Sequence, residues 1–345
     1  MGSFFNKIAR KEDPAIYQNK DGHLKRTLRV RDFLALGVGT IVSTSIFTLP
    51  GIVAAQHAGP AVALSFLLAA IVAGLVAFTY AEMAAAMPFA GSAYSWVNVL
   101  FGEFFGWVAG WALLAEYFIA VAFVASGFSA NLRGLVKPIG IELPAALSNP
   151  FGTNGGFIDI IAAIVILLTA LLLSRGMSEA ARMENILVIL KVLAIILFVI
   201  VGLTAINVSN YVPFIPEHKV TATGDFGGWQ GIYAGVSMIF LAYIGFDSIA
   251  ANSAGTLVAF MFVSLAMYRL RKREGKDLPI PAFKLPLYPV LPAVTFVLVL
   301  LVFWGLGFEA KLYTLIWFIV GIILYLSYGL RHSKKNDVAE YHQPK

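Results

Sequence analysis

The sequence contains no cysteine. This absence excludes disulfide bonds, catalytic thiolates and cysteine-ligated metal sites. Charged residues are also scarce, because they make up 13% of the chain while hydrophobic residues make up 59% and the mean hydropathy is +0.81. A soluble domain would carry roughly twice that share of charge. The composition therefore excludes a soluble globular protein and indicates a membrane protein.

The chain also lacks the residue sets on which enzymes and nucleic-acid-binding proteins depend. Its five histidines fall in loops, segment ends or tails, with no metal-ligand spacing and no acid–base pair. It has no glycine-rich phosphate-binding loop followed by a lysine. The net charge of +6 comes from residues at the edges of apolar segments rather than from one patch. We therefore expect a protein that is not an enzyme, uses no cofactor or metal and binds no nucleic acid.

What the sequence does contain is a series of long apolar runs joined by short loops. Several runs reach about 20 residues, the length that crosses a hydrocarbon core of ~30 Å. The sequence therefore predicts an all-α polytopic membrane protein with about eight crossings and no soluble domain. The expected segments are 33–56, 61–87, 101–128, 157–174, 186–206, 229–270, 287–307 and 312–330.

Lysine and arginine are distributed unevenly among the predicted loops. If the N-terminus is cytoplasmic and each segment crosses once, 20 of the 25 basic residues face the cytoplasm, four face outward and Lys191 lies within a segment. Cytoplasmic loops are enriched in these residues, so both termini are predicted to be cytoplasmic. The expected organisation is a cytoplasmic tail over 1–31, one transmembrane domain over 32–331 in the cell membrane, and a cytoplasmic tail over 332–345.

The segment 229–270 is longer than one crossing requires. Its 42 residues contain a single acidic residue, Asp247. As one straight helix it would be about 63 Å long, roughly twice the hydrocarbon thickness. Two crossings would need a turn near residues 247–255, which would place most downstream basic residues outside. The charge distribution therefore favours a single crossing here.

The first apolar segment contains a stretch poorly suited to a continuous membrane helix, residues 37–47. It holds two glycines and four hydroxyl residues, and Pro50-Gly51 follow it. Glycine costs a helix about 1 kcal/mol relative to alanine, and serine and threonine compete for backbone hydrogen bonds. One interpretation is a helix broken near the membrane centre, with exposed amides facing an anionic group. The alternative is an intact helix whose small residues let a neighbour pack closely.

A second weak point lies at residues 240–248, where Gly245 is followed by Asp247. Interrupted helices at corresponding places in two halves of a chain indicate the central site of a secondary transporter. The two stretches together favour the interpretation as a functional break. For Asp247, a role as the N-cap of a half-helix is favoured over direct ligand contact.

Lys191 lies inside the fifth apolar segment, about two turns from its polar end at Glu184. A lysine at this depth is costly and is a candidate functional residue, either as a fixed cation in place of a sodium ion or as a proton carrier. The alternative is that its long side chain reaches back to the cytoplasmic interface.

Glu116 lies within the third segment, where a carboxyl group needs a partner. Three roles remain open for it: a proton site, a contact with a substrate amine, or a structural hydrogen bond to backbone. Glu82 and Glu103 fall at segment ends and are expected at the membrane interface.

These motifs resemble those of one transporter family. The run 37–51, the stretch Tyr80-Ala81-Glu82-Met83-Ala84-Ala85-Ala86-Met87-Pro88-Phe89-Ala90-Gly91-Ser92-Ala93-Tyr94, and Ala242-Tyr243-Ile244-Gly245-Phe246-Asp247 are similar to bacterial permeases of the amino acid–polyamine–organocation superfamily, near its cationic amino-acid transporter branch. The resemblance covers nearly the whole chain. It implies a LeuT-like fold of twelve helices, ten of them in two inverted five-helix repeats.

The resemblance also implies a site. Amides around Ser43, Thr44 and Ser45 would bind a substrate carboxylate, while carbonyls near Ile41 and from Phe240 and Ala242 would take the substrate ammonium. Phe240 and Ile244 would bound the pocket. Lys191 matches the lysine that stands in for sodium in proton-coupled members, and Glu116 matches a glutamate of the cationic branch. The implied partners are an amino acid, the lipid bilayer and protons.

The sequence departs from the family pattern at two places, one in the expected site and one in the expected fold. Ser43-Thr44-Ser45 replaces the family's Gly-Thr-Gly, which crowds the carboxylate site. After Ala254 the chain passes to Gly255 and a stretch similar to helix ten, so helices seven to nine and most of the second inverted repeat are missing. Two hypotheses follow: a secondary amino-acid transporter, proton-coupled or exchanging, or an internally deleted member that is inert or regulatory and associates with another copy.

Overall fold

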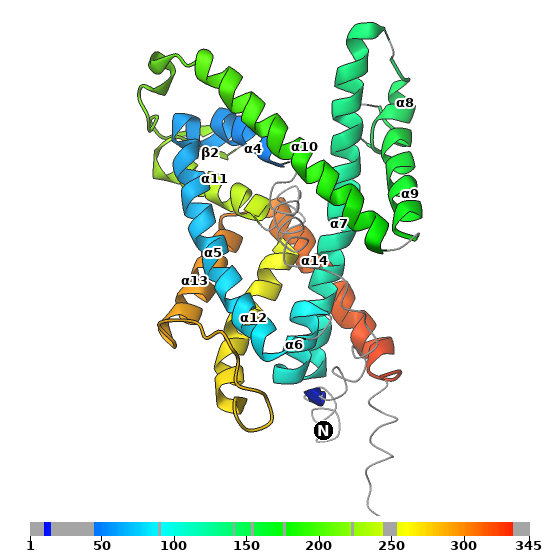
Figure 1. Ribbon diagram of the computed structural model, residues 1–345, viewed down its shortest axis with the longest axis vertical. Helices are drawn as coiled ribbons and strands as arrows, with labels where there is room; N and C mark the ends of the chain where they lie inside the picture. Colours follow the sequence, from blue (N-terminus) through cyan, green and yellow to red (C-terminus); the bar gives the residue numbers. More distant parts are fainter. Residues whose placement is uncertain are drawn as a thin grey trace, which may run out of the picture. The chain divides into compact units, whose positions relative to one another are not determined.

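The computed structural model describes residues 10–14, 45–88, 91–140, 142–152, 155–174, 177–221, 224–243 and 254–333 (Figure 1). The chain divides into two compact units, which are described separately. Unit 1 comprises residues 1–25, 71–116 and 250–345. Unit 2 comprises residues 26–70 and 117–249.

Unit 1 is helical. It contains the C-terminal part of α5 (Val62–Ala86) and the N-terminal part of α7 (Glu103–Val136). Its complete helices are α6 (Ser92–Phe101), α12 (Ala254–Arg273), α13 (Val290–Trp304) and α14 (Phe308–Leu324), the last continuing into a π-helical turn, η5 (Tyr325–Gly329). Helix α12 packs against α6, α13 and α14, and Figure 1 shows it between α6 and α13.

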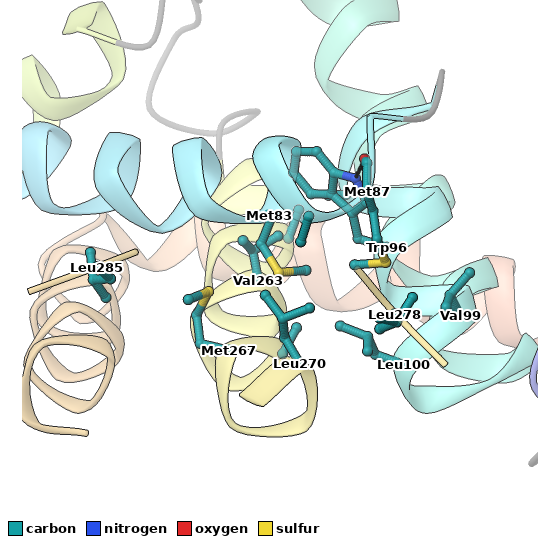
Figure 2. Close-up of a cluster of buried hydrophobic side chains, with 14 of the residues drawn as sticks. Met83, Met87, Trp96, Val99, Leu100, Val263, Met267, Leu270, Leu278 and Leu285 are labelled. Atoms are coloured by element: carbon teal, nitrogen blue, oxygen red, sulfur yellow. Dashed lines mark hydrogen bonds between the residues drawn. The ribbon is translucent and has the colours of Figure 1, made fainter. Parts of the chain in front are cut away.

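The core of unit 1 forms where α5, α6 and α12 meet (Figure 2). Apolar side chains recur every three or four residues on α12, so one face of that helix is buried. The indole of Trp96 donates a hydrogen bond to the carbonyl of Met87 at 2.8 Å, which joins the start of α6 to the end of α5. The labelled core residues are Met83, Met87, Trp96, Val99, Leu100, Val263, Met267, Leu270, Leu278 and Leu285.

Unit 2 contains α4 (Ser45–Val53), the π-helical turn η1 (Ala54–Ala58) and the 3-10 turn η2 (Gly59–Ala61), followed by the start of α5. It also holds the end of α7, the turn η3 (Lys137–Ile139), α8 (Ala145–Ser148), α9 (Ile160–Ser174), α10 (Met177–Thr204), η4 (Val208–Tyr211) and α11 (Gly228–Tyr243). Helix α11 packs against α4 and η1, and α9 packs against α8 and α10.

A short hairpin in unit 2 departs from the all-α prediction. Strands β1 (Lys219–Thr221) and β2 (Gly224–Phe226) pair antiparallel. The His218 imidazole lies 2.8 Å from the Asp225 carboxylate, and Nδ1 of the buried His57 lies 3.0 Å from the Asp225 carbonyl oxygen. The expectation of no histidine–acid pair was therefore wrong, because three-residue strands carry too little alternation to reveal which residues face each other.

Most predicted segments are confirmed as helices, with three differences. The segment 229–270 is divided between α11 and α12, with residues 244–253 and therefore Asp247 outside the described part of the chain. Helix α6 was not predicted as an element. Helix α10 begins at Met177 rather than near 186, because its polar first turns consist mostly of good helix formers.

Among the described residues, four helices are long and apolar enough to cross a membrane: Leu49–Ala86, Glu103–Ile139, Asn185–Thr204 and Phe308–Gly329. Ile160–Ser174 and Val290–Trp304 are shorter apolar helices. The first span joins α4 and α5 through the turns η1 and η2, where the sequence predicts two crossings. These spans fit a polytopic membrane protein.

Candidate functional site

The first and sixth apolar segments lie against each other in unit 2. Helix α4, which contains Ser45, contacts α11, which contains Phe240 and Ala242. Ile41, Ser43, Thr44 and Ile244 lie outside the described residues. The structure therefore brings together the two elements that the sequence predicts to share a site.

Glycine in α11 permits this close approach. A Cβ at Gly235 would lie 2.7 Å from the Ser65 hydroxyl and 2.8 Å from a methyl group of Val53. A Cβ at Gly231 would lie 2.2 Å from the His57 carbonyl oxygen. The Ser65 hydroxyl donates to the carbonyl of Ile232 at 2.9 Å, so the start of α5 is also bonded to α11. Small residues let helix backbones approach closely in membranes, as they do here.

Phe240 is the predicted pocket residue whose surroundings the structure describes. Its side chain is fully buried, and α11 ends three residues later at Tyr243. A buried aromatic side chain near the end of a helix can bound a small apolar cavity. This position is consistent with its predicted role as a wall of the pocket.

Glu116 lies in unit 1, in α7, with only 4% of its side chain exposed. Its carboxyl group interacts with the hydroxyl of Thr256, which is equally buried in the first turn of α12. Among the described residues, Oε2 of Glu116 and Oγ1 of Thr256 form no well-aligned hydrogen bond. A buried polar group without a hydrogen-bond partner lowers the stability of the folded protein by about 1–3 kcal/mol. Both atoms are therefore suited to bind an incoming polar group.

Thr256 is a candidate that sequence reasoning missed. It follows Glu116 by 140 positions, and a single threonine near the start of an apolar run resembles any helix-forming segment. Only the packing of α12 against its neighbours reveals the pair. The three roles predicted for Glu116 stay predictions.

Lys191 lies in α10, within the apolar span Asn185–Thr204, and its side chain is half-buried. Its neighbours Leu190 and Val192 are exposed, while Val188 is buried one turn earlier. Helix α10 belongs to the same unit as α4 and α11. The half-buried position agrees with a lysine on the inner face of a span, and it leaves both sequence-based interpretations of Lys191 in place.

Glu82 lies in the last turns of α5, and its expected position at the membrane interface stays a prediction. Its side chain is fully buried, and both carboxylate oxygens face the Arg271 guanidinium at 3.0 and 3.1 Å. The backbone N–H of Leu285 donates to the same carboxylate at 2.6 Å. Arg271 also pairs with Glu274 and lies over the ring of Tyr288. This network joins the end of α5 to α12 and to the loop before α13.

Comparison with known proteins adds independent information. Residues 29–254 match the family model described as amino acid permease. The chain is 46% identical to the branched-chain amino acid permease BcaP of Lactococcus lactis, in an alignment that covers 94% of this chain and 99% of that protein. This alignment extends over 463 positions, 118 more than the chain has residues.

Other relatives match a smaller part of this chain. The chain is 38% identical to the methylthioribose transporter of Bacillus subtilis over 68% of its length, and it spans about half (49%) of that protein. It is 37% identical to the vacuolar cationic amino acid transporter 2 of Arabidopsis thaliana over 71% of its length, covering 38% of that protein.

Proposed function

Since this chain belongs to the amino acid permease family, we propose that it carries a neutral, branched-chain amino acid across the cell membrane by alternating access. Family membership makes it an integral membrane transporter of amino acids rather than an enzyme, as the sequence motifs indicate. The observation that carries the narrower proposal is the 46% identity to a branched-chain amino acid permease along almost the whole of both chains.

The proposed substrate site follows the LeuT-like pattern. Amides around Ser43, Thr44 and Ser45 would bind the substrate carboxylate, and carbonyls near Ile41, Phe240 and Ala242 would take the ammonium. Phe240 and Ile244 would bound the side-chain pocket. The contact between α4 and α11, and the burial of Phe240, support this arrangement.

We assign Glu116 and Thr256 to the polar part of the transport path. A buried carboxyl group beside a hydroxyl, with no cation in the described surroundings, is suited to carrying a proton rather than to holding a fixed negative charge. A substrate with an apolar side chain brings no second cation to pair with Glu116. The proposed neutral substrate and a protonated Glu116 are therefore mutually consistent.

Lys191 is the proposed coupling residue, its ammonium standing in for a sodium ion. Its half-buried place in an apolar span supports this role. We expect Lys191→Met to reduce proton-driven uptake to the level measured without a gradient while insertion and folding are retained, because methionine keeps the length of the side chain and removes the charge. Lys219→Met, in the exposed hairpin, is the control. Unchanged proton-driven uptake in Lys191→Met would assign Lys191 to the interface instead.

The family match and the alignment length both concern the proposed gap in the second half of the chain. The family match ends at residue 254, and the alignment with the Lactococcus permease needs 118 more positions than this chain provides. Both support a gap near Ala254 and Gly255, with helices seven to nine of the family absent. Backbone groups left facing lipid cost several kcal/mol each. We therefore propose that a second copy of the chain shields the surface that those helices would cover.

The direct test uses the purified full chain in liposomes. Saturable uptake of labelled leucine, competed by valine and isoleucine but not by arginine, is the expected result. Competition by arginine would replace the neutral substrate with a cationic one. A folded, correctly inserted chain without saturable uptake of any amino acid would refute transport by this chain, and cross-linking in the same liposomes tests the second copy.

A further inference from the structure

Three stretches of unit 1 meet at the C-terminal end of α12: residues 10–13, the junction of α6 and α7, and the last turns of α12 itself. The N–H of Glu103 donates to the carbonyl of Arg10 at 2.8 Å, and the two side chains form an ion pair at 3.5 Å. The Asn98 amide donates to the Glu12 carboxylate at 2.7 Å. These bonds fix residues 10–13 against α6 and α7 and leave the Lys11 side chain exposed.

Four cations occupy this end of the unit, and we call them the basic surface: Lys11, Arg269, Lys272 and Arg273. The guanidinium of Arg269 lies 5.4 Å from the ring centre of Phe101. Arg273 donates to the carbonyl of Val99 and pairs with Asp277. Among the described residues, Lys11, Arg269 and Lys272 form no ion pair with a carboxylate. The basic surface therefore carries more positive charge than its neighbours neutralise.

The cations are close enough to act on one another. The pKa of the Lys11 ammonium is lowered from its usual value, first by the slight burial of this largely exposed group and then by the positive charges of Arg273 and Arg269. The Asp277 carboxylate acts in the opposite direction but is already bonded to Arg273. Mutual repulsion among exposed cations falls when an anion binds between them. The surface is thus electrostatically complementary to an anion.

The same face of α12 is apolar one turn earlier. Phe262, Leu265, Arg269 and Lys272 follow at spacings of three, four and three residues, which place them on one side of the helix. Leu265 is 38% exposed. Phe105 of α7 is 37% exposed and its ring contacts those of Phe101 and Phe262. An exposed face that changes from apolar to basic over two turns matches the boundary between hydrocarbon and lipid headgroups.

We propose that the basic surface binds the headgroup of an acidic phospholipid whose acyl chain lies along Phe105, Phe262 and Leu265. The cations supply the charge that recognises the phosphate, and the exposed apolar stripe selects a lipid over a free phosphate ion. The fixed N-terminal segment matters because it brings Lys11 to α12. The site lies outside the substrate elements α4 and α11, so it does not depend on which amino acid is carried.

The test measures lipid binding to the full chain by native mass spectrometry in a neutral detergent, with phosphatidylglycerol and phosphatidylcholine titrated separately. The variant is Arg269→Gln with Lys272→Gln. The matched control is Lys137→Gln with Lys219→Gln, which removes two exposed charges elsewhere. A third variant, Leu265→Gln, changes the apolar stripe and leaves every charge in place. Thermal unfolding without added lipid confirms that each variant is folded.

We expect phosphatidylglycerol to bind more tightly than phosphatidylcholine, with an affinity that falls as salt is added. Each removed cation should weaken binding about fivefold, from the usual effect of one basic residue near an anionic headgroup. Leu265→Gln should weaken it too, and the control should not. Equal binding of both lipids, or unchanged phosphatidylglycerol binding in the Arg269–Lys272 variant, would overturn the proposal. Displacement of the lipid by millimolar inorganic phosphate would assign the surface to a free anion instead.

Discussion

Trp111 in α7 and Trp317 in α14 bind each other's backbone. The indole N–H of Trp111 donates to the carbonyl of Trp317 at 2.9 Å, and the indole N–H of Trp317 donates to the carbonyl of Trp111 at 3.0 Å. Their rings are stacked, with centres 4.8 Å apart. One turn later on α14, the carbonyl of Gly321 accepts from the indole of Trp107. A backbone carbonyl oxygen in an α-helix can accept a second hydrogen bond, and the indole groups supply it here. These bonds fix α14 against α7.

Gly321 should be required for this contact. A Cβ at this position would lie 2.4 Å from two atoms of the Trp111 ring. We expect Gly321→Ala to destabilise the protein by about 1–3 kcal/mol, because the Trp111 ring must leave its place. Gly307→Ala is the control, since a Cβ there meets no atom within 4 Å. Thermal unfolding of the purified variants in detergent measures the difference, and equal stability of the two would show that the indole pair is not tightly held.

The buried pair of Glu82 and Arg271 gives a second prediction. Removing one partner of a buried ion pair typically costs 3–5 kcal/mol because the other charge remains without compensation. We therefore expect Glu82→Gln to lower stability by about that range. Glu142→Gln breaks an exposed pair with Lys137 and should change stability by no more than about 1 kcal/mol.

A double-mutant cycle separates the interaction of Glu82 with Arg271 from other effects. If Glu82→Gln and Arg271→Gln combine without extra loss, the two residues are coupled as the structure shows. Full additivity of the two losses would mean that the hydrogen bond from Leu285 holds Glu82 in place without Arg271.

The helices could be predicted from the sequence, whereas this network could not. Runs such as 157–174 and 312–330 are apolar over most of their length, and composition alone identifies them. Glu82 ends an apolar run, and this position alone does not predict that it is buried beside Arg271. Its partner is 189 positions away, and no periodicity links residues at that separation.

Part of the candidate site could also be predicted from the sequence, and part of it could not. Glycine and hydroxyl residues within apolar segments indicated that the first and sixth segments build a site together, and the contact between α4 and α11 agrees. The predictions for Ile41, Ser43, Thr44 and Ile244 stay predictions, because these residues are outside the described part of the chain. Thr256 was missed because its role depends on which helix α12 meets, and that is decided by packing rather than by local sequence.

Thr256 supplies the third prediction. If the Thr256 hydroxyl forms a hydrogen bond with the Glu116 carboxyl during transport, Thr256→Val should reduce uptake by roughly tenfold to a hundredfold, the equivalent of one hydrogen bond to an ionisable group. Thr256→Ser should retain uptake because it keeps the hydroxyl. Thr295→Val is the control, since the buried Thr295 hydroxyl donates to the carbonyl of Leu291 in its own helix. Normal uptake by Thr256→Val would show that Glu116 acts without it.

The last prediction concerns the orientation of the chain in the membrane. The distribution of lysine and arginine places both termini in the cytoplasm, and this orientation places the loop that contains Lys137 outside. The chain has no cysteine, so single-cysteine variants need no cysteine-free background. Lys137 is exposed in the turn η3, after a helix that is long enough to span the membrane. We expect a membrane-impermeant thiol reagent added to intact cells to label Lys137→Cys, and to label Lys334→Cys only after the cells are opened. Labelling of Lys334→Cys in intact cells would contradict the cytoplasmic placement of the C-terminus.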